Sequence, residues 1–566
     1  DGDGNPVDCD YDKVDPENSS SVDNLVWCGS QPVGTLTTGT RKLFVITIML
    51  CAIFMAAGTV WGIKGGIPAN DKKPPPNEED PPATPIDGYY FWKLGHMDGP
   101  HDMSKALGIS RDGKVAVGAT KVVDFIKAFR IDIDWAISTG DGEAPLYNEL
   151  QVQENIGNGE AYAASDKDGL DGDGNPVDCD YDKVDPENSS SVDNLVWCGS
   201  QPVGTLTTGT VSYAAEWLFA FDPEATEEDP LNYLGIPDFG GGISAMAANG
   251  VSADGLIIVG TGNVQTGEVG FLADMATATV DETTGETVVE PVQLIITEVT
   301  EENPEGQTLQ SSSAQAVSAD GTIIAGYGGV KTGNKAFVTL FEGTEVDAEG
   351  NVTAILTSTI LPAIAGGKWS EAYAMTVTDE GVIYVAGRSD SPKGPQACIW
   401  FEGDDPTTTD VVETWVVKGL GGLSKKKYDS VATGIVYRPG STAGDLMVVG
   451  SSKTILYPSE AFVWTGNPVL EPDGPYTLPD GGENEYIGYM YDLEKILIKT
   501  GAAEASGAGS SWILNQGTGV ALSDVVNAGD NGPSARIVGW GTNPEGGGEA
   551  WLVTNYPYDD LEFIKE

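Results

Sequence analysis

Positive charge is scarce in this chain. Its 566 residues include 30 lysines and arginines but 85 aspartates and glutamates, which gives a formal net charge of −55 at pH 7. A protein this acidic is repelled by nucleic acid and by anionic lipid, so we predict no nucleic-acid partner. The same charge attracts divalent cations and is typical of secreted or salt-adapted proteins.

The residues that many enzyme motifs need are also missing. Only His96 and His101 occur, and there is no phosphate-binding glycine loop, no CxxCH haem motif and no Ser-His-Asp set beyond chance. The two histidines lie near Asp98 and Asp102 and could bind a transition metal, but such a pair more often lies in a polar loop. We therefore predict that the protein is not an enzyme and uses no catalytic residues.

Cysteine is infrequent, with six residues in the whole chain. In a secreted protein the neighbours Cys179 and Cys198 predict a disulfide that closes a loop of about 20 residues, worth roughly 3 kcal/mol in the chain-entropy model. Two free thiols are the alternative. Cys398 takes the place of a phenylalanine in a repeated apolar strand, which predicts a buried core residue.

Glycine, by contrast, is abundant, and it marks a repeat that is clearest at residues 314–341. A run of small residues, 314–318, is followed by Asp320-Gly321 and then by apolar residues 322–326. Asp-Gly between two such runs favours a hairpin with a type I′ turn, because the central residues of that turn need positive φ. Residues 336–340 form a third predicted strand.

The unit recurs along the chain, and we count seven copies. Each has small residues, a turn, a strand ending in glycine and an apolar closing strand. The copies begin with residues 106–118, 161–169, 247–260, 314–326, 372–387, 432–450 and 521–539. A further strand lies between copies, for example at 354–361 and 415–420, so each unit supplies about four strands at a spacing of roughly sixty residues.

Four strands per unit and seven units predict an all-β, seven-bladed β-propeller. Residues 89–95 look like the last strand of a unit without its beginning, and they can complete the final blade and close the ring. The glycine after each second strand leaves room for close backbone approach, and the Ala-Phe-x-Trp strands would pack between blades. A β-solenoid or a string of sandwiches is the rival architecture.

The motif Ala-x-x-Val-Ser-x-Asp-Gly-x-x-x-x-Gly, followed by Ala-Phe-x-Trp, resembles the HAF family of probable extracellular repeats. The resemblance covers roughly residues 86–556 and is strongest at 247–272 and 311–341. It implies a secreted bacterial protein with a propeller-like fold, no defined activity and no catalytic residues. The second, sixth and seventh units depart from the pattern.

The N-terminal part of the chain contains an unusual copy. Residues 1–40 repeat residues 171–210 letter for letter, and they place acidic residues before a signal-like segment. We therefore expect that 1–40 are not a natural N-terminus. Arg41-Lys42 and the apolar run 43–63 predict a signal peptide, or an uncleaved membrane anchor at 41–63, since about 20 apolar residues span a bilayer.

The remaining boundaries follow from composition. Residues 64–85 are a proline-rich, extended linker, 86–556 form the propeller, and 557–566 are a C-terminal tail. We predict that the protein is extracellular or on the cell surface, with membrane contact only through 43–63 if that segment is retained.

An acidic insertion at 171–210, in the second unit, contains the one residue pattern that predicts a metal site. Aspartates at alternate positions with glycine and asparagine between them can wrap a calcium ion with oxygen ligands. The predicted ligands are Asp171, Asp173, Asn175, the Val177 carbonyl, Asp178, Asp180 and Asp182. Pro176 replaces the usual turn glycine, and an unstructured acidic loop is the alternative.

These features favour a non-enzymatic structural or binding module with a calcium-stabilised insertion. Its partners would be calcium and either an extracellular glycan or further copies of itself in a filament or surface layer. The alternative is a polysaccharide hydrolase or lyase with carboxylates at the propeller mouth. Two facing carboxylates 5–10 Å apart would indicate that enzyme.

Overall fold

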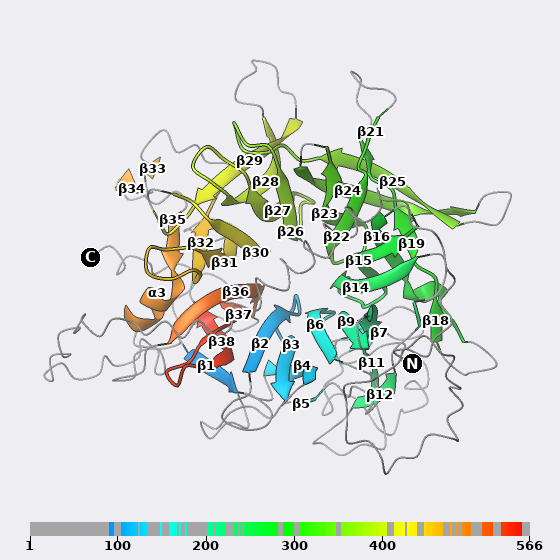
Figure 1. Ribbon diagram of the computed structural model, residues 1–566, viewed down its shortest axis with the longest axis horizontal. Helices are drawn as coiled ribbons and strands as arrows, with labels where there is room; N and C mark the ends of the chain where they lie inside the picture. Colours follow the sequence, from blue (N-terminus) through cyan, green and yellow to red (C-terminus); the bar gives the residue numbers. More distant parts are fainter. Residues whose placement is uncertain are drawn as a thin grey trace, which may run out of the picture. The chain divides into compact units, whose positions relative to one another are not determined.

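The computed structural model describes twenty-five segments of the chain. They comprise residues 90–95, 103–122, 125–133, 148–149, 158–166, 169–170, 176–177, 201–208, 211–221, 231–235, 238–239, 243–265, 267–280, 287–298, 306–331, 333–346, 352–404, 413–424, 427–438, 446–467, 476–477, 483–484, 489–499, 512–523 and 534–556. Seven small sheets form a ring, as predicted, and the fold is a seven-bladed β-propeller (Figure 1).

Each blade is a meander whose first strand is the innermost. Blade 1 contains β2 (Met103–Ile109), β3 (Val115–Val122), β4 (Phe125–Asp132) and β5 (Asn148–Glu149). Blade 2 contains β6 (Asn158–Ala164), β9 (Pro202–Thr208) and β10 (Val211–Glu216), followed by β11 (Leu218–Phe221) and β12 (Leu231–Gly235). Blade 3 contains β14 (Ser244–Val251), β15 (Ile257–Val264), β16 (Gly267–Asp274) and β19 (Val292–Leu294).

The later blades are more regular. Blade 4 contains β22 (Ser311–Val317), β23 (Ile323–Val330), β24 (Gly333–Val346) and β25 (Val352–Ile360). Blade 5 contains β26 (Ser370–Val377), β27 (Ile383–Ser389), β28 (Gln396–Asp404) and β29 (Glu413–Gly421). Blade 6 contains β30 (Ser430–Tyr437), β31 (Leu446–Ser452), β32 (Glu460–Gly466) and β35 (Tyr489–Asp492).

Blade 7 joins the two ends of the propeller. It contains β36 (Ile513–Leu522), β37 (Ala535–Thr542), β38 (Gly548–Tyr556) and, as its outer strand, β1 (Tyr90–Gly95). The strand β1 is antiparallel to β38, and Trp92 Nε1 donates a hydrogen bond of 3.0 Å to Thr554 Oγ1. The predicted closure of the last blade by residues 89–95 is confirmed, and Figure 1 shows the blue β1 beside the red β38.

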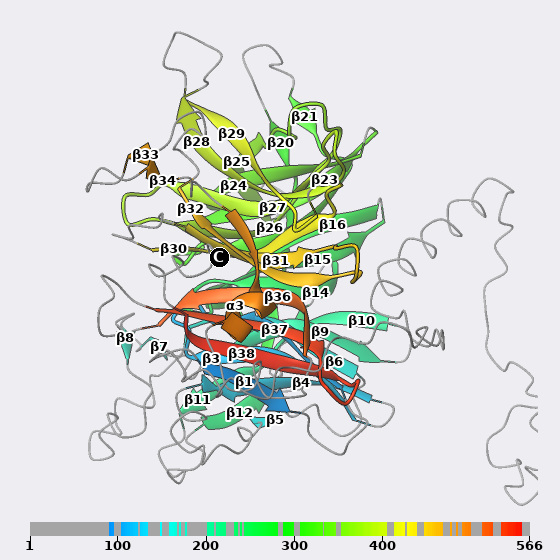
Figure 2. The same ribbon diagram turned by 90° about the vertical axis from the view of Figure 1, so that its left-hand side faces the viewer.

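Smaller elements lie outside the blades. They are the pairs β7 (Gly169–Leu170) with β8 (Pro176–Val177), β20 (Thr297–Glu298) with β21 (Gln307–Thr308), and β33 (Tyr476–Thr477) with β34 (Glu483–Asn484); the strands β13 (Asp238–Phe239), β17 (Thr279–Val280) and β18 (Thr287–Val289); the 3-10 turn Met275–Thr277; and α3 (Leu493–Lys499). The sequence analysis missed α3. Its buried Leu493, Ile496 and Leu497 follow helical spacing and belong to a core cluster shared by blades 6 and 7. Figure 2 shows α3 beside β36.

In blade 2, a part of the acidic segment 171–210 forms a strand of the propeller itself. The strand β9 pairs with both β6 and β10, and Gly204 stands opposite Ala161 and Ala215. Pro202–Thr208 is therefore the second strand of this blade, although it belongs to the segment 171–210. The part of that segment that is added to the blade lies between Ala164 and Pro202.

The turn after the first strand of blades 1, 3 and 4 is a four-residue loop and not the predicted two-residue turn. Gly321 N donates to Ser318 O at 3.1 Å, and Ser318 N donates to Ile323 O at 2.8 Å, which encloses a four-residue loop. The Asp320 carboxylate accepts hydrogen bonds from Ser318 Oγ and Thr322 N. Gly321 takes a φ of 74°, so the prediction of a hairpin is confirmed and the type I′ assignment is wrong.

The predicted close approach at the second strand is confirmed. A Cβ atom on Gly326 would lie 2.1 Å from the Ser313 carbonyl oxygen and 2.9 Å from the Phe337 ring. The equivalent glycine of every other blade meets a first-strand carbonyl oxygen at 1.9–2.1 Å. These glycines are Gly118, Gly204, Gly260, Gly387, Gly450 and Gly539. In five blades the glycine also leaves room for a third-strand aromatic ring, whereas Gly204 and Gly387 stand opposite Ala215 and Cys398.

The core consists of the layers between blades. Phe337 packs with Val259 and Leu272 of the preceding blade, while Trp400 packs with Ala325 and Val338. The predicted role of the Ala-Phe-x-Trp strands between blades is confirmed. Cys398 is fully buried and free, also as predicted.

Several predictions fall on residues that the structure does not describe. They include the copy at 1–40, the segment 41–63, the linker 64–85, the two histidines, Cys179 and Cys198. Within the described ranges, no helix is long and apolar enough to cross a membrane.

Candidate functional site: the central channel

The seven first strands share one irregularity. Each contains a β-bulge in its pairing with the second strand, at the variable residue between two small residues. The bulge residues are Leu107, Tyr162, Asn249, Gln315, Tyr373, Thr433 and Thr518. All seven are half-buried, and we call them the bulge ring. Bulges re-aim side chains in this way and are frequent beside functional sites.

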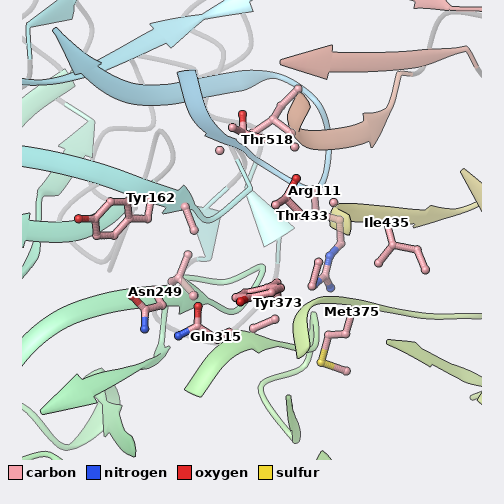
Figure 3. A pocket seen from close by; sticks show the side chains of 18 of the residues that line it. Arg111, Tyr162, Asn249, Gln315, Tyr373, Met375, Thr433, Ile435 and Thr518 are labelled. Carbon is pink, nitrogen blue, oxygen red and sulfur yellow. The ribbon is translucent and has the colours of Figure 1, made fainter. Parts of the chain in front are cut away.

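The bulge ring surrounds a cavity in the centre of the propeller. The cavity has a volume of about 470 Å³, and every first strand contributes to its lining. In Figure 3 the labelled side chains of the ring lie around this space from different strands. The next level of the lining is mostly apolar and includes Ile109, Val317, Met375 and Ile435. A cavity of this size and mixed character is typical of a small-ligand site.

Small residues after the bulges bring the first strands close together. A Cβ atom on Gly108 would lie 2.2 Å from the Tyr162 carbonyl oxygen, and one on Gly434 would lie 3.2 Å from Gly519 Cα. The Ala-x-Gly and Ala-x-Ala patterns are therefore a requirement of the narrow centre of the ring. The residue between them is free to vary because it faces the cavity.

Asn249 and Gln315 supply the two amides of the bulge ring. Asn249 Nδ2 donates to Ala314 O at 2.8 Å and to Thr261 Oγ1 at 3.1 Å. Gln315 Nε2 donates to Ser313 Oγ at 2.7 Å. Both N–H groups of Asn249 are thus engaged, while Gln315 keeps one. The carbonyl oxygens of both amides remain as acceptors.

Thr433 and Thr518 direct their hydroxyl groups to the next blade. Thr433 Oγ1 donates to Gly517 O at 2.6 Å, and Thr518 Oγ1 donates to Ala106 O at 2.8 Å. Both acceptors precede the bulge residue of the following blade, as Ala314 does for Asn249. The same hydrogen bond therefore links blades 3 to 4, 6 to 7 and 7 to 1.

The two tyrosines of the bulge ring are each held by a glutamate two residues earlier, in a repeated Glu-Ala-Tyr-Ala sequence. Tyr162 Oη donates to Glu160 Oε2 at 2.8 Å, and Tyr373 Oη donates to Glu371 Oε2 at 2.5 Å. Burial and the adjacent carboxylates raise the pKa of both phenols. The hydroxyl groups stay protonated and donate to the glutamates. The tyrosines therefore contribute mainly their aromatic rings to the cavity.

Glu371 organises a cluster at the end of the channel where the first strands begin. Arg388 Nε donates to Glu371 Oε2 at 2.7 Å, and Asn334 Nδ2 donates to Glu371 Oε1 at 2.6 Å. The Arg388 guanidinium lies 5.2 Å from the centre of the Trp369 ring. This cluster fixes the orientation of Tyr373, and both carboxylate oxygens of Glu371 accept hydrogen bonds within it.

The opposite end of the channel, where the four-residue loops lie, carries Arg111 and Asp166. Arg111 Nη2 donates to Val317 O across the channel at 3.4 Å. Asp166 Oδ1 accepts a hydrogen bond of 3.0 Å from Asp112 N. Burial, and then repulsion by the Asp112 carboxylate, raise the pKa of Asp166 to about 6. Burial lowers the pKa of Arg111, while Asp166 and Asp320 partly restore it.

The carboxylate pair expected of a glycosidase does not occur in the described lining of the cavity. Asp166 is its one acidic side chain and Arg111 its one basic side chain. Glu160 and Glu371 lie near the opposite rim, but each is bonded to a tyrosine.

The predicted calcium ligands lie almost entirely outside the described residues. Val177 is described, and its strand β8 pairs with β7, so that Gly169 stands opposite Val177. Asp171, Asp173, Asn175, Asp178, Asp180 and Asp182 are not described. Elsewhere in the described part of the chain, no group of three or more histidine, cysteine or acidic side chains is placed to hold a metal.

Sequence reasoning missed the bulge ring. The available signal was the variable position in Ala-x-Ala, which is occupied by aromatic, amide and hydroxyl side chains in a unit that is otherwise constant. A variable polar residue inside a conserved strand pattern is where a site can differ from the scaffold.

Comparisons with known proteins give little further guidance. No protein-family model and no curated protein matches the chain, so the resemblance to HAF repeats stays a prediction. Among solved structures, the chain is similar to TolB from Acinetobacter baumannii, with 9% sequence identity and a TM-score of 0.25. The match covers 65% of this chain and 61% of the TolB chain, so it spans less than two thirds of TolB.

Proposed function

We propose that this protein is a secreted or cell-surface binding module that holds an extracellular glycan in its central channel and catalyses no reaction. The bulge ring is the observation that carries this proposal. Seven independent bulges place seven side chains around one cavity of about 470 Å³, and a fold that needed only a filled centre would not require their chemical variety.

The chemistry of the bulge ring supports a sugar ligand. Tyr162 and Tyr373 offer ring surfaces on which the C–H groups of a sugar can pack, because their hydroxyl groups are held by glutamates. Asn249, Thr433 and Thr518 offer oxygen atoms to the hydroxyl groups of the ligand. A mixed site of this kind suits a molecule that is polar at its edges and apolar on its faces.

Binding of oligosaccharides to the full chain tests the proposal. A glycan array would identify ligands, and calorimetric titration would measure their affinity. Thr433→Phe places a bulky ring in the cavity and should abolish binding, whereas Thr353→Phe, on the exposed outer strand β25, should leave it unchanged. Unchanged binding by a folded Thr433→Phe variant, or no binding by any glycan, would contradict the proposal.

Self-assembly and calcium binding belong to the same hypothesis. The acidic insertion departs most from the repeat symmetry, which favours it as a calcium-stabilised contact region. Electron microscopy of the native protein separates isolated discs from fibres or layers.

A further inference from the structure

The bulge ring has an unequal supply of hydrogen-bond donors and acceptors. Six of its side chains are polar, and five of these have every donor engaged with the protein. The engaged side chains are Tyr162, Asn249, Tyr373, Thr433 and Thr518. Gln315 alone keeps one free N–H group. The ring therefore presents oxygen acceptors to a ligand and almost no donors.

The excess of acceptors over free donors favours ligands whose polar groups donate hydrogen bonds. Carboxylate, sulfate and phosphate groups only accept hydrogen bonds, so the free N–H group of Gln315 would be their one partner among the side chains of the ring. An ammonium group only donates, and a hydrogen bond from a charged donor is about twice as strong as a neutral one. Hydroxyl groups can also donate, but they carry no charge.

The surrounding charges and rings favour a cation as well. The chain carries a net charge of −55, which attracts cations to its surface. Tyr162 brings an aromatic ring into the bulge ring, and a ring face attracts an ammonium group within about 6 Å. The Tyr373 ring already has the Arg388 guanidinium 5.9 Å from its centre. The fold already places cations in this way, since Lys105 Nζ lies 4.7 Å from the centre of the Trp540 ring.

Arg111 sets the direction from which a ligand can enter. Its guanidinium lies at the loop end of the channel, where it donates to Val317 O and is flanked by Asp166. A positively charged ligand is repelled from that end. It can enter from the other end, where Glu160 lies beside Tyr162. Glu371 also lies at that end, where it forms an ion pair with Arg388.

We propose that the glycan bound in the channel is an amino sugar with free amino groups, held through its ammonium groups by the acceptor oxygens of the bulge ring. This inference rests on the proposed glycan-binding function and narrows it to one chemical class. It predicts that the bulge ring does not hold uronic acids or sulfated sugars, since Arg111, the one basic side chain of the described lining, lies at the loop end beside Asp166.

Four oligosaccharides of equal length test the inference by calorimetric titration of the full chain. They are a glucosamine trimer, its N-acetylated form, a neutral β-glucose trimer and a galacturonate trimer. We expect the glucosamine trimer to bind at least about tenfold more tightly than the two neutral trimers, and the galacturonate trimer not to bind. The preference should shrink as salt is added, because ions screen the attraction.

Two variants of Gln315 place opposite charges at the same position of the bulge ring. Gln315→Glu removes the last free donor and should tighten binding of the glucosamine trimer, whereas Gln315→Lys should abolish it. Gln307→Lys makes the same charge change at an exposed position in β21 and serves as the control. Circular dichroism and thermal unfolding confirm that each variant is folded.

The outcomes separate the two proposals. Equal binding of the glucosamine and neutral trimers, or binding of galacturonate, would overturn the amino-sugar inference and leave the glycan-binding function standing. No binding of any trimer would remove both. Equal loss of affinity in Gln315→Lys and Gln307→Lys would show that the general charge, and not the bulge ring, governs binding, and would also overturn the inference.

Discussion

The hydroxyl group of Thr518 donates a hydrogen bond of 2.8 Å to the carbonyl oxygen of Ala106, which lies 412 residues earlier in the chain. The bond joins the first strands of blades 7 and 1, at the place where the ring closes. The pairing of β1 with β38 closes the same ring at its outer edge. The propeller is therefore closed at its outer edge by a strand and at its centre by a side chain that also belongs to the bulge ring, with Ser104 and Arg536 supplying further hydrogen bonds between the same two blades.

Thr518→Val removes the hydrogen bond at the centre of this closure. We expect it to lower the free energy of unfolding by about 1 kcal/mol, because a partly buried hydrogen bond is lost and the shape of the side chain is kept. Thr433→Val removes the equivalent bond to Gly517 O and should cost about as much. Urea denaturation measures both, and Thr353→Val on the exposed strand β25 is the control. A Thr518→Val variant as stable as this control would show that this hydrogen bond is dispensable.

The architecture followed from the sequence because its causes are local and repeated. Small residues, a Ser-x-Asp-Gly turn, a strand ending in glycine and an aromatic closing strand each have a direct steric reason, as Gly326 beneath Phe337 shows. The closing strand at 89–95 could be inferred because a strand without a blade at one end matched a blade without a strand at the other.

The bulge ring was not predicted from the sequence, because a bulge breaks the two-residue alternation on which strand prediction depends. The alternation places Gln315 on the opposite side of the strand from Ala314 and Ala316, but it does not say that this side faces a channel. Blade 2 was counted among the seven units, but its second strand was not predicted, for another reason. Its second strand, Pro202–Thr208, is weakly hydrophobic and lies in a segment that is acidic as a whole.

Gly326→Ala tests the close approach at the second strand. The added Cβ atom would lie 2.1 Å from Ser313 O, and backbone atoms of a packed blade cannot move aside. We expect a loss of about 3 kcal/mol in unfolding free energy, or failure to fold. At Gly159 a Cβ atom would meet its nearest neighbour, a Trp217 ring atom, at 3.5 Å, so Gly159→Ala should change stability by less than about 0.5 kcal/mol. Equal effects at the two sites would refute the steric explanation.

Calcium binding by the insertion can be tested directly on the full chain. Residues 1–12 repeat the loop at 171–182, so we expect two sites by calorimetric titration and one after the double change Asp171→Asn and Asp173→Asn. A chelator should lower the melting temperature, because calcium binds the ordered loop in preference to the unfolded one. No heat of binding and no change in melting temperature would exclude the site.

Glu216 is an acidic residue at a third-strand position that is apolar in blades 3 to 7, whereas blade 1 has Arg130 there. Glu216 stands opposite Val203, as Val338 stands opposite Ala325 in blade 4, and it is fully buried with no hydrogen-bond partner among the described residues. Burial raises the pKa of its carboxyl group well above the usual range. We expect Glu216→Leu to raise the unfolding free energy at pH 7 by more than about 1 kcal/mol.

The measurement is thermal or urea unfolding of the two proteins, with Glu345→Leu on exposed β24 as the control for added apolar surface. A gain no larger than the control's would mean that Glu216 is compensated in the folded state.

Asp166, at the loop end of the channel, makes the stability of the fold depend on pH. Because its pKa is raised to about 6 in the folded protein, against an ordinary value of about 3.9, folding favours the protonated carboxyl group. Its contribution to stability is therefore fully present below about pH 4 and is lost as the pH rises through 6. The loss amounts to about 2 to 3 kcal/mol at pH 8.

Asp166→Asn should remove this dependence, since the amide oxygen can still accept the hydrogen bond from Asp112 N but carries no charge. The variant should be the more stable protein above pH 6 and should match the parent at pH 4. Unfolding measured from pH 4 to pH 8 checks both ends of this range. A constant difference across the range would mean that the Asp166 carboxyl group keeps an ordinary pKa, with the Arg111 guanidinium offsetting its burial.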